Sequence, residues 1–399
     1  MYNVRKVTDD LYWVGANDRR LALFENVYPL PQGISYNSYL LLDEKTVLLD
    51  TVDAAAGRQF FENITHVLNG RPLDYLIINH MEPDHCAEIE NVWRRYPQVK
   101  LICNAQTQKM LQQFFSFSLP TEQFILVKEG DEISTGRHTF RFVMAPMVHW
   151  PEVMVSYETN DKILFSADAF GTFGTLDGRL FADEADFSHQ YLDEARRYYA
   201  NIVGKYGVQV QSLLKKVSAL DIKMICPLHG FVWRKDLPFI IDKYQKWSLY
   251  EAEEDGVVII YGSIYGNTEN AAEVLACRLA EKGMHNIRMF DVSKTHASYI
   301  ISEIFRCAKI VFAAATYNGG IFVNMENLLH DIIAHNVQNR RIALLDNGTW
   351  AAMAGKLMRS ELEKLKNCTI IEPTISLKSA LKEEQYEALD NMATQILDD

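Results

Sequence analysis

The second half of the chain alternates strand-like and helix-like segments so regularly that few folds can accommodate it. Beyond the acidic stretch 251–256, five apolar runs are each followed by a helical segment. The runs are Val257–Tyr261, Asn286–Phe290, Ile310–Ala315, Ile342–Leu345 and Thr369–Ile371. The helical segments lie near 269–282, 297–306, 325–335, 354–366 and 383–397. Such β-α units place their strands in parallel, so residues 256–399 are predicted to form an α/β doubly wound five-stranded parallel sheet.

The first 250 residues follow a different pattern, in which short strand-like runs are separated by Gly, Pro and polar residues. The runs are Leu11–Val14, Tyr39–Leu42, Thr46–Val52, Tyr75–Ile78, Leu101–Cys103, Phe140–Met144 and Ile163–Phe165. Helical stretches appear near 86–95, 107–116, 190–203 and 238–249. Strands that come early, with helices intercalated later, favour an α+β sandwich with its helices outside. We therefore predict two domains, at 1–250 and 256–399.

Composition narrows the class of protein. The net charge of −12 argues against nucleic-acid binding, which requires a surface rich in Lys and Arg. No apolar run approaches the roughly 20 residues that span a bilayer, and the N-terminal residues lack an apolar signal core. The cysteines are scattered, without a Cys-x-x-Cys pair, which excludes a zinc ribbon or a rubredoxin-type iron centre. We expect free thiols in a reducing compartment, and a cytoplasmic protein that binds neither membrane nor nucleic acid.

Four potential metal ligands lie within six residues, directly after the strand-like run Tyr75–Ile78: His80, Glu82, Asp84 and His85. In an extended loop His80 and Glu82 share a face, whereas Asp84 and His85 diverge, so the segment can serve two adjacent metal ions. A solvated polar loop in which Asp84 caps a helix is the simpler interpretation for one histidine and one acid. The density of ligands here favours a metal site.

Three further candidates follow other strand-like runs: His149, Asp168 and His229. Each alone would more often be a capping or hydrogen-bonded residue than a ligand. Their shared position after apolar runs groups them with the first four, and Asp168 could bridge two cations through its two oxygens. The remaining histidines are interpreted as surface or structural residues: His66, His138, His189, His285, His296, His330 and His335.

The second half carries a phosphate-binding pattern between its first strand and first helix. The residues are Ser263, Ile264, Tyr265, Gly266, Asn267 and Thr268. Hydroxyl groups, a glycine and backbone N–H groups at a helix N-terminus form a cradle for phosphate, although a plain polar turn would have similar composition. The spacing matches neither the Walker A motif nor the Gly-x-Gly-x-x-Gly fingerprint.

Two later loops fall at strand ends near the topological switch point, where doubly wound sheets bind ligands. Their residues are Thr316, Tyr317, Asn318, Gly319 and Gly320, then Asn347, Gly348, Thr349 and Trp350. The glycines allow a planar ring to approach the backbone, and Tyr317 or Trp350 could stack on that ring. The alternative is that these aromatic side chains only pack the loops against the sheet.

The ligand set resembles the metal site of the metallo-β-lactamase superfamily, and specifically its flavodiiron (A-type flavoprotein) branch. Most hydrolases of that superfamily carry histidine where this chain has Glu82. Imidazole-rich sites suit zinc, whereas mixed histidine and carboxylate ligation suits redox-active iron. The loop of Ser263, Tyr265, Asn267 and Thr268 resembles the flavodoxin phosphate loop, whose ligand is FMN.

This resemblance implies a metallo-β-lactamase-like αββα diiron domain at 1–250, followed by a flavodoxin-like FMN domain at 256–399. One iron would take His80, Glu82 and His149. The other would take Asp84, His85 and His229, with Asp168 bridging the two. Candidates to line the gas pocket are Phe24, Glu25, Tyr28 and Trp150.

The resemblance also implies an activity and partners. The family reduces dioxygen to water, nitric oxide to nitrous oxide, or both, with electrons relayed through FMN. The electrons would come from a separate donor, such as a rubredoxin-like protein or a reduced deazaflavin coenzyme. A head-to-tail homodimer or a dimer of dimers would bring one chain's flavin beside the other chain's irons.

Two other functions stay open at this point. One is a zinc-dependent hydrolase of the same superfamily with an accessory flavodoxin module. The other is an electron-transfer flavoprotein whose first half has lost its metals. Glu82 weighs against the first alternative, and the intact set of ligands against the second.

Overall fold

The computed structural model describes residues 1–116 and 120–398 and divides the chain into two units. The first unit comprises Met1–Tyr199 with Val208–Gln245, and the second comprises Ala200–Gly207 with Lys246–Asp399. The acidic stretch 251–256 lies inside the second unit, because strand β17 (Glu254–Gly262) begins within it. None of the described helices is long and apolar enough to cross a membrane.

Two sheets form the centre of the first unit. One has the order β1-β2-β7-β8-β9-β10-β11 and the other has the order β12-β13-β14-β15-β16. The strands of the first are β1 (Arg5–Lys6), β2 (Leu11–Trp13), β7 (Tyr39–Leu42), β8 (Thr46–Leu49), β9 (Tyr75–Ile77), β10 (Lys100–Cys103) and β11 (Phe124–Leu126). Those of the second are β12 (Glu132–Ser134), β13 (Thr139–Met144), β14 (Met154–Glu158), β15 (Ile163–Phe165) and β16 (Met224–Cys226). Two short ribbons pair β3 (Ala16–Asp18) with β6 (Ile34–Tyr36), and β4 (Leu23–Phe24) with β5 (Tyr28–Pro29).

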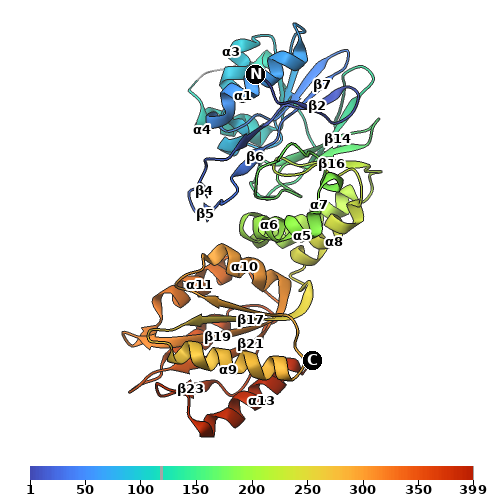
Figure 1. The fold of residues 1–399 in the computed structure, drawn as a ribbon. Coiled ribbons are helices and arrows are strands. Elements are labelled where there is room, and N and C mark those ends of the chain that lie inside the picture. The colour runs from blue at the N-terminus through green and yellow to red at the C-terminus, as the bar shows by residue number, and fades with distance from the viewer. Residues whose placement is uncertain (117–119, 399) are drawn as a thin grey trace. The chain divides into compact units, whose positions relative to one another are not determined.

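Helices cover the outer faces of both sheets, and the predicted αββα sandwich is confirmed (Figure 1). The helices on the side of the first sheet are α1 (Gly57–Leu68), α3 (Ile89–Arg95) and α4 (Ala105–Phe114). Those on the side of the second sheet are α6 (Leu192–Tyr198), α7 (Gly207–Val217) and α8 (Leu237–Ser248), with the short α5 (Phe187–Gln190) beside them. Sequence analysis missed α1 and α7, although Phe60, Ile64, Val67 and Leu68 of α1 are buried at helical spacing.

The second unit is the predicted doubly wound sheet, with strand order β18-β17-β19-β21-β22. Its further strands are β18 (Ile287–Asp291), β19 (Cys307–Tyr317), β21 (Arg341–Asn347) and β22 (Thr369–Ile370). The fifth position is completed by β23 (Ile375–Leu377), which is also parallel to β21, and the short β20 (Gly320–Ile321) pairs antiparallel with β19. β23 was not predicted, because Glu372 and Pro373 interrupt the apolar run.

Helices lie on both faces of this sheet, with α9 (Asn267–Glu281) and α13 (Tyr386–Leu397) on one and α10 (Ala297–Arg306) and α11 (Val323–Ala334) on the other (Figure 1). The remaining helix is α12 (Ala354–Leu362). Leu275 of α9 and Leu389 of α13 pack with Ile259 and Val311 of the central strands in one buried core. The strand order reverses between β17 and β19, so the loops after these strands meet at the ligand-binding edge.

A polar cluster joins the two sheets of the first unit. His138, before β13, lies 3.0 Å from Asp10 and 3.1 Å from Glu158, measured from its ring nitrogens to the carboxylate oxygens. These groups have the composition of a metal site, but Arg137 already pairs with Asp10 and Asp161. Burial would lower the pKa of His138, but its contacts with Glu158 and Asp10 outweigh burial and raise that pKa to about 9. The cluster is therefore a salt-bridge network at neutral pH.

Replacing His138 with glutamine should make stability less dependent on pH. Because the folded-state pKa is raised, the charged histidine stabilises the fold fully below pH 6.5, and this contribution is lost as the pH rises through about 9. We expect the variant to be less stable than the native chain by about 1–2 kcal/mol near pH 6, after allowance for solvent screening. Urea unfolding between pH 6 and 10 should show this difference shrinking. His189→Gln, at an exposed histidine, is the control, and a difference constant with pH would contradict the assignment.

Candidate functional site

All seven predicted metal ligands gather in two adjoining buried groups of the first unit. Within each group the candidate ligand atoms lie within 4.8 Å of one another. The first group contains His80, Glu82, His149 and Asp168, and the second contains Asp84, His85 and His229. Each residue follows a strand, as expected: β9 for the first segment, β13 for His149, β15 for Asp168 and β16 for His229.

The geometry of the first segment differs from the extended loop that the sequence suggested. The extended conformation ends at Glu82, and Pro83 begins the short helix α2 (Pro83–Cys86), which contains Asp84 and His85. Proline is favoured at the first position of a helix because its fixed φ suits the helical conformation. The helical turn directs Asp84 and His85 to the second group.

Asp168 connects the two groups through its two carboxylate oxygens. Oδ2 lies 3.1 Å from Nε2 of His80 and 3.1 Å from Nε2 of His149. Oδ1 lies 3.3 Å from Nε2 of His85 and 3.5 Å from Nε2 of His229. One buried carboxylate thus faces a different pair of histidines with each oxygen.

The residues present fit a pair of metal ions. Atoms bound about 2.1 Å from one ion lie about 3.0–3.4 Å apart. The distances from Asp168 to His80, His149 and His85 fall in this range, and that to His229 is 3.5 Å. Buried oxygens of Asp84 and Asp168 have no hydrogen-bond partner in the described chain, as expected of atoms meant for a cation. Nε2 of His85 and Nε2 of His229 face each other at 3.0 Å. Three carboxylates and four imidazoles form a donor set suited to iron.

The electrostatics of the groups point the same way. Burial would lower the pKa of His149, but contacts with Asp168 and Glu82 raise it to about 9. Burial would raise the pKa of Asp168, yet the charges of His80 and His85 hold it well below its ordinary value. The carboxylates of Asp168 and Glu82 thus favour positive charge beside them.

Two buried acids that sequence analysis missed accept hydrogen bonds from the segment that carries the first ligands. Glu152 accepts hydrogen bonds from Nδ1 of His80 and from the backbone N–H of Met81, both at 2.8 Å. Asp50 accepts from the backbone N–H and the side-chain amide of Asn79, both at 2.7 Å. Asp50 directly follows β8, and Glu152 shortly precedes β14. Their positions next to strand ends were the sequence signal that could have identified them.

Aromatic rings surround the cluster. Phe24 meets the ring of His229 edge-on at 5.5 Å, and Trp150 meets His80 at 5.4 Å. Glu25 lies at the tip of the β4–β5 hairpin, where partial burial and the charge of Glu82 raise its pKa to about 8. Tyr28 lies 6.4 Å from Phe173 between ring centroids. The assignment of these residues to a gas pocket stays a prediction.

The three predicted loops of the second unit meet around a cavity of about 450 Å³. The predicted residues that line it are Ser263, Ile264, Tyr265, Asn267, Thr268, Thr316, Tyr317, Asn318, Gly319, Asn347, Gly348, Thr349 and Trp350. Gly266 lies in the first loop and donates its N–H to Oγ of Ser263 just before α9, and Gly320 begins β20 directly after the second loop. Ser379 was missed because it follows the unpredicted β23.

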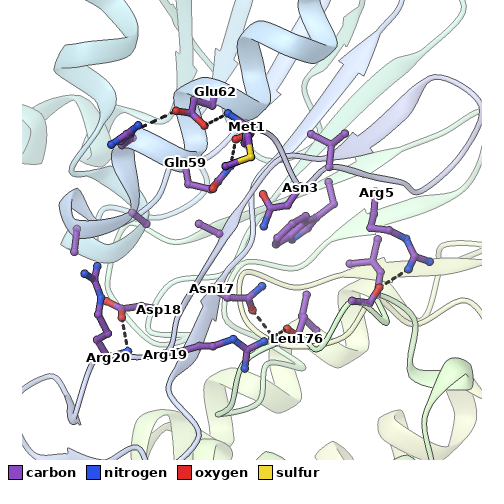
Figure 2. Close-up of a pocket in the computed structure, with 18 of the residues that line it drawn as sticks. Met1, Asn3, Arg5, Asn17, Asp18, Arg19, Arg20, Gln59, Glu62 and Leu176 are labelled. Atoms are coloured by element: carbon purple, nitrogen blue, oxygen red, sulfur yellow. Dashed lines mark hydrogen bonds and ion pairs between the residues drawn. The ribbon is translucent and has the colours of Figure 1, made fainter.

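A cavity of about 750 Å³ elsewhere in the first unit contains none of the candidate ligands (Figure 2). Arginine side chains line it, but several are already engaged: Arg5 donates to Glu184, and Arg19 to Leu176. Glu62 pairs with Arg58 and with the amino group of Met1. Its size alone does not make it the functional site, which requires the convergent ligands found around Asp168.

Both halves of the chain match families of known proteins. Residues 34–230 match the ODP family beta lactamase model, and residues 259–388 match the flavodoxin model. The chain is 32% identical over 384 residues to the anaerobic nitric oxide reductase flavorubredoxin of Vibrio vulnificus, covering 94% of this chain and 75% of that protein. The chain belongs to the flavodiiron protein family. The predicted family is thereby confirmed.

Solved structures of flavodiiron proteins share the whole fold. The rubredoxin oxygen:oxidoreductase of Desulfovibrio gigas is 29% identical, with a TM-score of 0.92 over 98% of this chain and 97% of that one. A flavoprotein from Thermotoga maritima is 27% identical, with a TM-score of 0.89 over 98% of each chain. The flavodiiron protein of Giardia intestinalis, 24% identical, has the same fold with a TM-score of 0.93 over 99% of this chain and 96% of that one.

Asp168→Asn should reduce iron binding at both positions of this flavodiiron protein. Asparagine has one oxygen and an NH₂ group that cannot ligate, so a bridging carboxylate cannot be replaced. We expect iron to fall from about two per chain to well below one. Elemental analysis of the purified protein measures this. Asp161→Asn, in the salt-bridge network, is the matched control and should keep its iron. Full retention of one iron in Asp168→Asn would show that Asp168 serves only one position.

Proposed function

We propose that this chain is a flavodiiron oxidoreductase that reduces dioxygen to water, nitric oxide to nitrous oxide, or both. The observation that carries the proposal is Asp168, whose two oxygens each face a separate pair of histidines in a buried site. Support comes from relatives matched over nearly the whole chain, which are named as a nitric oxide reductase and an oxygen oxidoreductase. They do not favour the zinc hydrolase.

His80, Glu82 and His149 would hold one iron, and Asp84, His85 and His229 the other, with Asp168 bridging. When bound, the irons supply a site that activates the diatomic gas, and FMN supplies electrons to it one at a time. The chain's own residues orient the ligands and limit water. Phe24 and Trp150 pack perpendicular to the rings of His229 and His80, one aromatic residue against each group of ligands.

In the second unit, Ser263, Asn267, Thr268 and the N-terminus of α9 would bind the FMN phosphate through hydroxyl, amide and backbone N–H groups. For the flavin ring we assign the stacking role to Trp350. Its side chain is 94% exposed at the cavity edge, whereas Tyr317 already packs against Phe322 with 6.4 Å between ring centroids. Trp350 lines this cavity together with Tyr265, which is also exposed, and exposed apolar groups gathered at a cavity mark a ligand or partner site.

Trp350→Ala should weaken FMN binding about tenfold or more, because the stacking contact and its buried area are lost. Trp350→Phe keeps a ring and should lose less. The dissociation constant is measured by quenching of FMN fluorescence as the flavin-free chain is titrated in. Tyr386→Ala removes a half-exposed aromatic outside the cavity and is the control. Equal affinity of Trp350→Ala and the native chain would assign the stacking role elsewhere.

The same proposal extends to organisation and partners. Residues 1–250 would carry the diiron site and 256–399 the FMN site. Electrons would arrive from a separate rubredoxin-like protein or a reduced deazaflavin coenzyme.

The exposed rings of Tyr265 and Trp350 beside the cavity support a head-to-tail homodimer, or a dimer of dimers, in which a second copy covers them. All six cysteines are free, which supports a reducing cytoplasmic location.

Stopped-flow mixing of the reduced holoprotein tests the proposal. Reduced chain, loaded with FMN and iron, is mixed anaerobically with dioxygen and with nitric oxide in parallel. We expect flavin reoxidation by at least one gas, slowed at least about tenfold in Asp168→Asn, which retains FMN but lacks the iron site. Reoxidation at the same rate in both proteins would reflect free-flavin chemistry and would contradict the proposal.

A further inference from the structure

Glu152 is a buried carboxylate directed at one ligand of the cluster. It lies in the loop between β13 and β14 with 1% of its surface exposed. Its Oε1 accepts the hydrogen bonds from Nδ1 of His80 and from the N–H of Met81, while Oε2 is buried without a hydrogen-bond partner in the described chain. The backbone carbonyl of Glu152 accepts a hydrogen bond of 2.6 Å from the side-chain amide of Asn104, which holds the loop in place.

Within the described residues, no carboxylate contacts Nδ1 of either histidine of the second group. Nδ1 of His229 contacts the backbone carbonyl of Ser35 at 2.7 Å, and Nδ1 of His85 has no hydrogen-bond partner in the described chain. The three rings therefore differ in the group behind them: a carboxylate for His80, a neutral carbonyl for His229 and none for His85. An acceptor on Nδ1 fixes the proton there and leaves Nε2 free to ligate, and a charged acceptor makes the ring a stronger donor.

The charges around the two positions are unequal as a result. Each position has one carboxylate of its own, Glu82 or Asp84, and one oxygen of Asp168. Glu152 adds a negative charge in direct contact with the ring of His80, whereas the charge of buried Asp50, which also acts on His85, is held by Asn79. The sole ion-pair partner of Glu152 in the described chain is His80, with no Lys or Arg beside it. A buried carboxylate without a basic partner is costly, and a metal ion bound through His80 offsets that cost.

We propose that Glu152 is a positioning residue that makes the two metal positions electronically unequal. It holds His80 with Nε2 toward the site, and it stabilises the ferric form of the iron at the position of His80, Glu82 and His149. In the one-electron reduced pair, the ferric ion then resides at that position. This inference rests on the diiron function proposed above.

Glu152→Gln tests the charge with little change in shape, because the amide oxygen can accept the same two hydrogen bonds. In iron-loaded, FMN-bound protein, a redox titration followed by EPR of the mixed-valent pair reports the one-electron potential. We expect the ferric form to lose at least about tenfold in relative stability, a rise of about 59 mV. Glu152→Asp retains the charge and should recover part of the shift.

Glu158→Gln is the matched control, since Glu158 is also a buried carboxylate in contact with a histidine, His138, but lies outside the cluster. It should leave the potential unchanged. A Glu152→Gln potential equal to the native value would overturn the inference, as would an equal shift in Glu158→Gln. If Glu152→Gln binds too little iron for EPR, the affinities of the two positions are measured by titration with Co²⁺ instead. Weaker Co²⁺ binding at one position supports the inference, and equally weaker binding at both positions contradicts it.

Failure of the proposed function would appear differently. If the native chain reduced neither gas, the comparison of potentials between the native chain and Glu152→Gln would still be measurable. If both gases were reduced but the potentials were equal, only the role of Glu152 would fail.

Discussion

The burial of the Asp168 carboxylate is the constraint on which the N-terminal site depends. A fully buried carboxylate needs positive charge or hydrogen-bond donors on both oxygens, and here each oxygen faces two imidazole nitrogens instead of a lysine or arginine. Those imidazoles must present nitrogen to a common point from three different loops. The two-sheet sandwich meets this requirement because its strand ends bring these loops together.

Residues that contact the candidate ligands, without being ligands themselves, fix the ligands in position. Asp50 fixes the backbone at Asn79, and Glu152 fixes His80, so the first position is held by two buried acids that do not themselves face the metal site. The second position is supported by the backbone carbonyl of Ser35, by the Thr51 hydroxyl on the carbonyl of His85, and by the helical turn that starts at Pro83. Two positions with the same kinds of ligands are thus supported to different degrees, which is a common means of tuning metal sites.

The second unit has its own candidate ligand site, at one edge of its parallel sheet. Three loops at the carboxyl ends of parallel strands surround one cavity, and among the described residues none that lines it carries a charge. A phosphate there would depend on hydroxyl groups and on the N-terminus of α9. The parallel, doubly wound arrangement was predictable because five β-α units in sequence leave few alternatives, whereas the order β18-β17-β19-β21-β22 came only from the structure. The division of the last strand into β22 and β23, and hence Ser379, was not predictable either.

The sequence by itself determined both fold classes and brought forward the seven candidate ligands that cluster in the first unit, because polar residues at strand ends and β-α alternation are local patterns. The glutamate at position 82, where the related zinc hydrolases carry histidine, also favoured iron over zinc. Only the tertiary structure decided which oxygen of Asp168 faces which histidine, that Pro83 turns Asp84 and His85 into a helix, and that Glu152 stands behind His80. Those relations join residues from different strands, far apart in the chain, and no spacing along the sequence encodes a distance across a core.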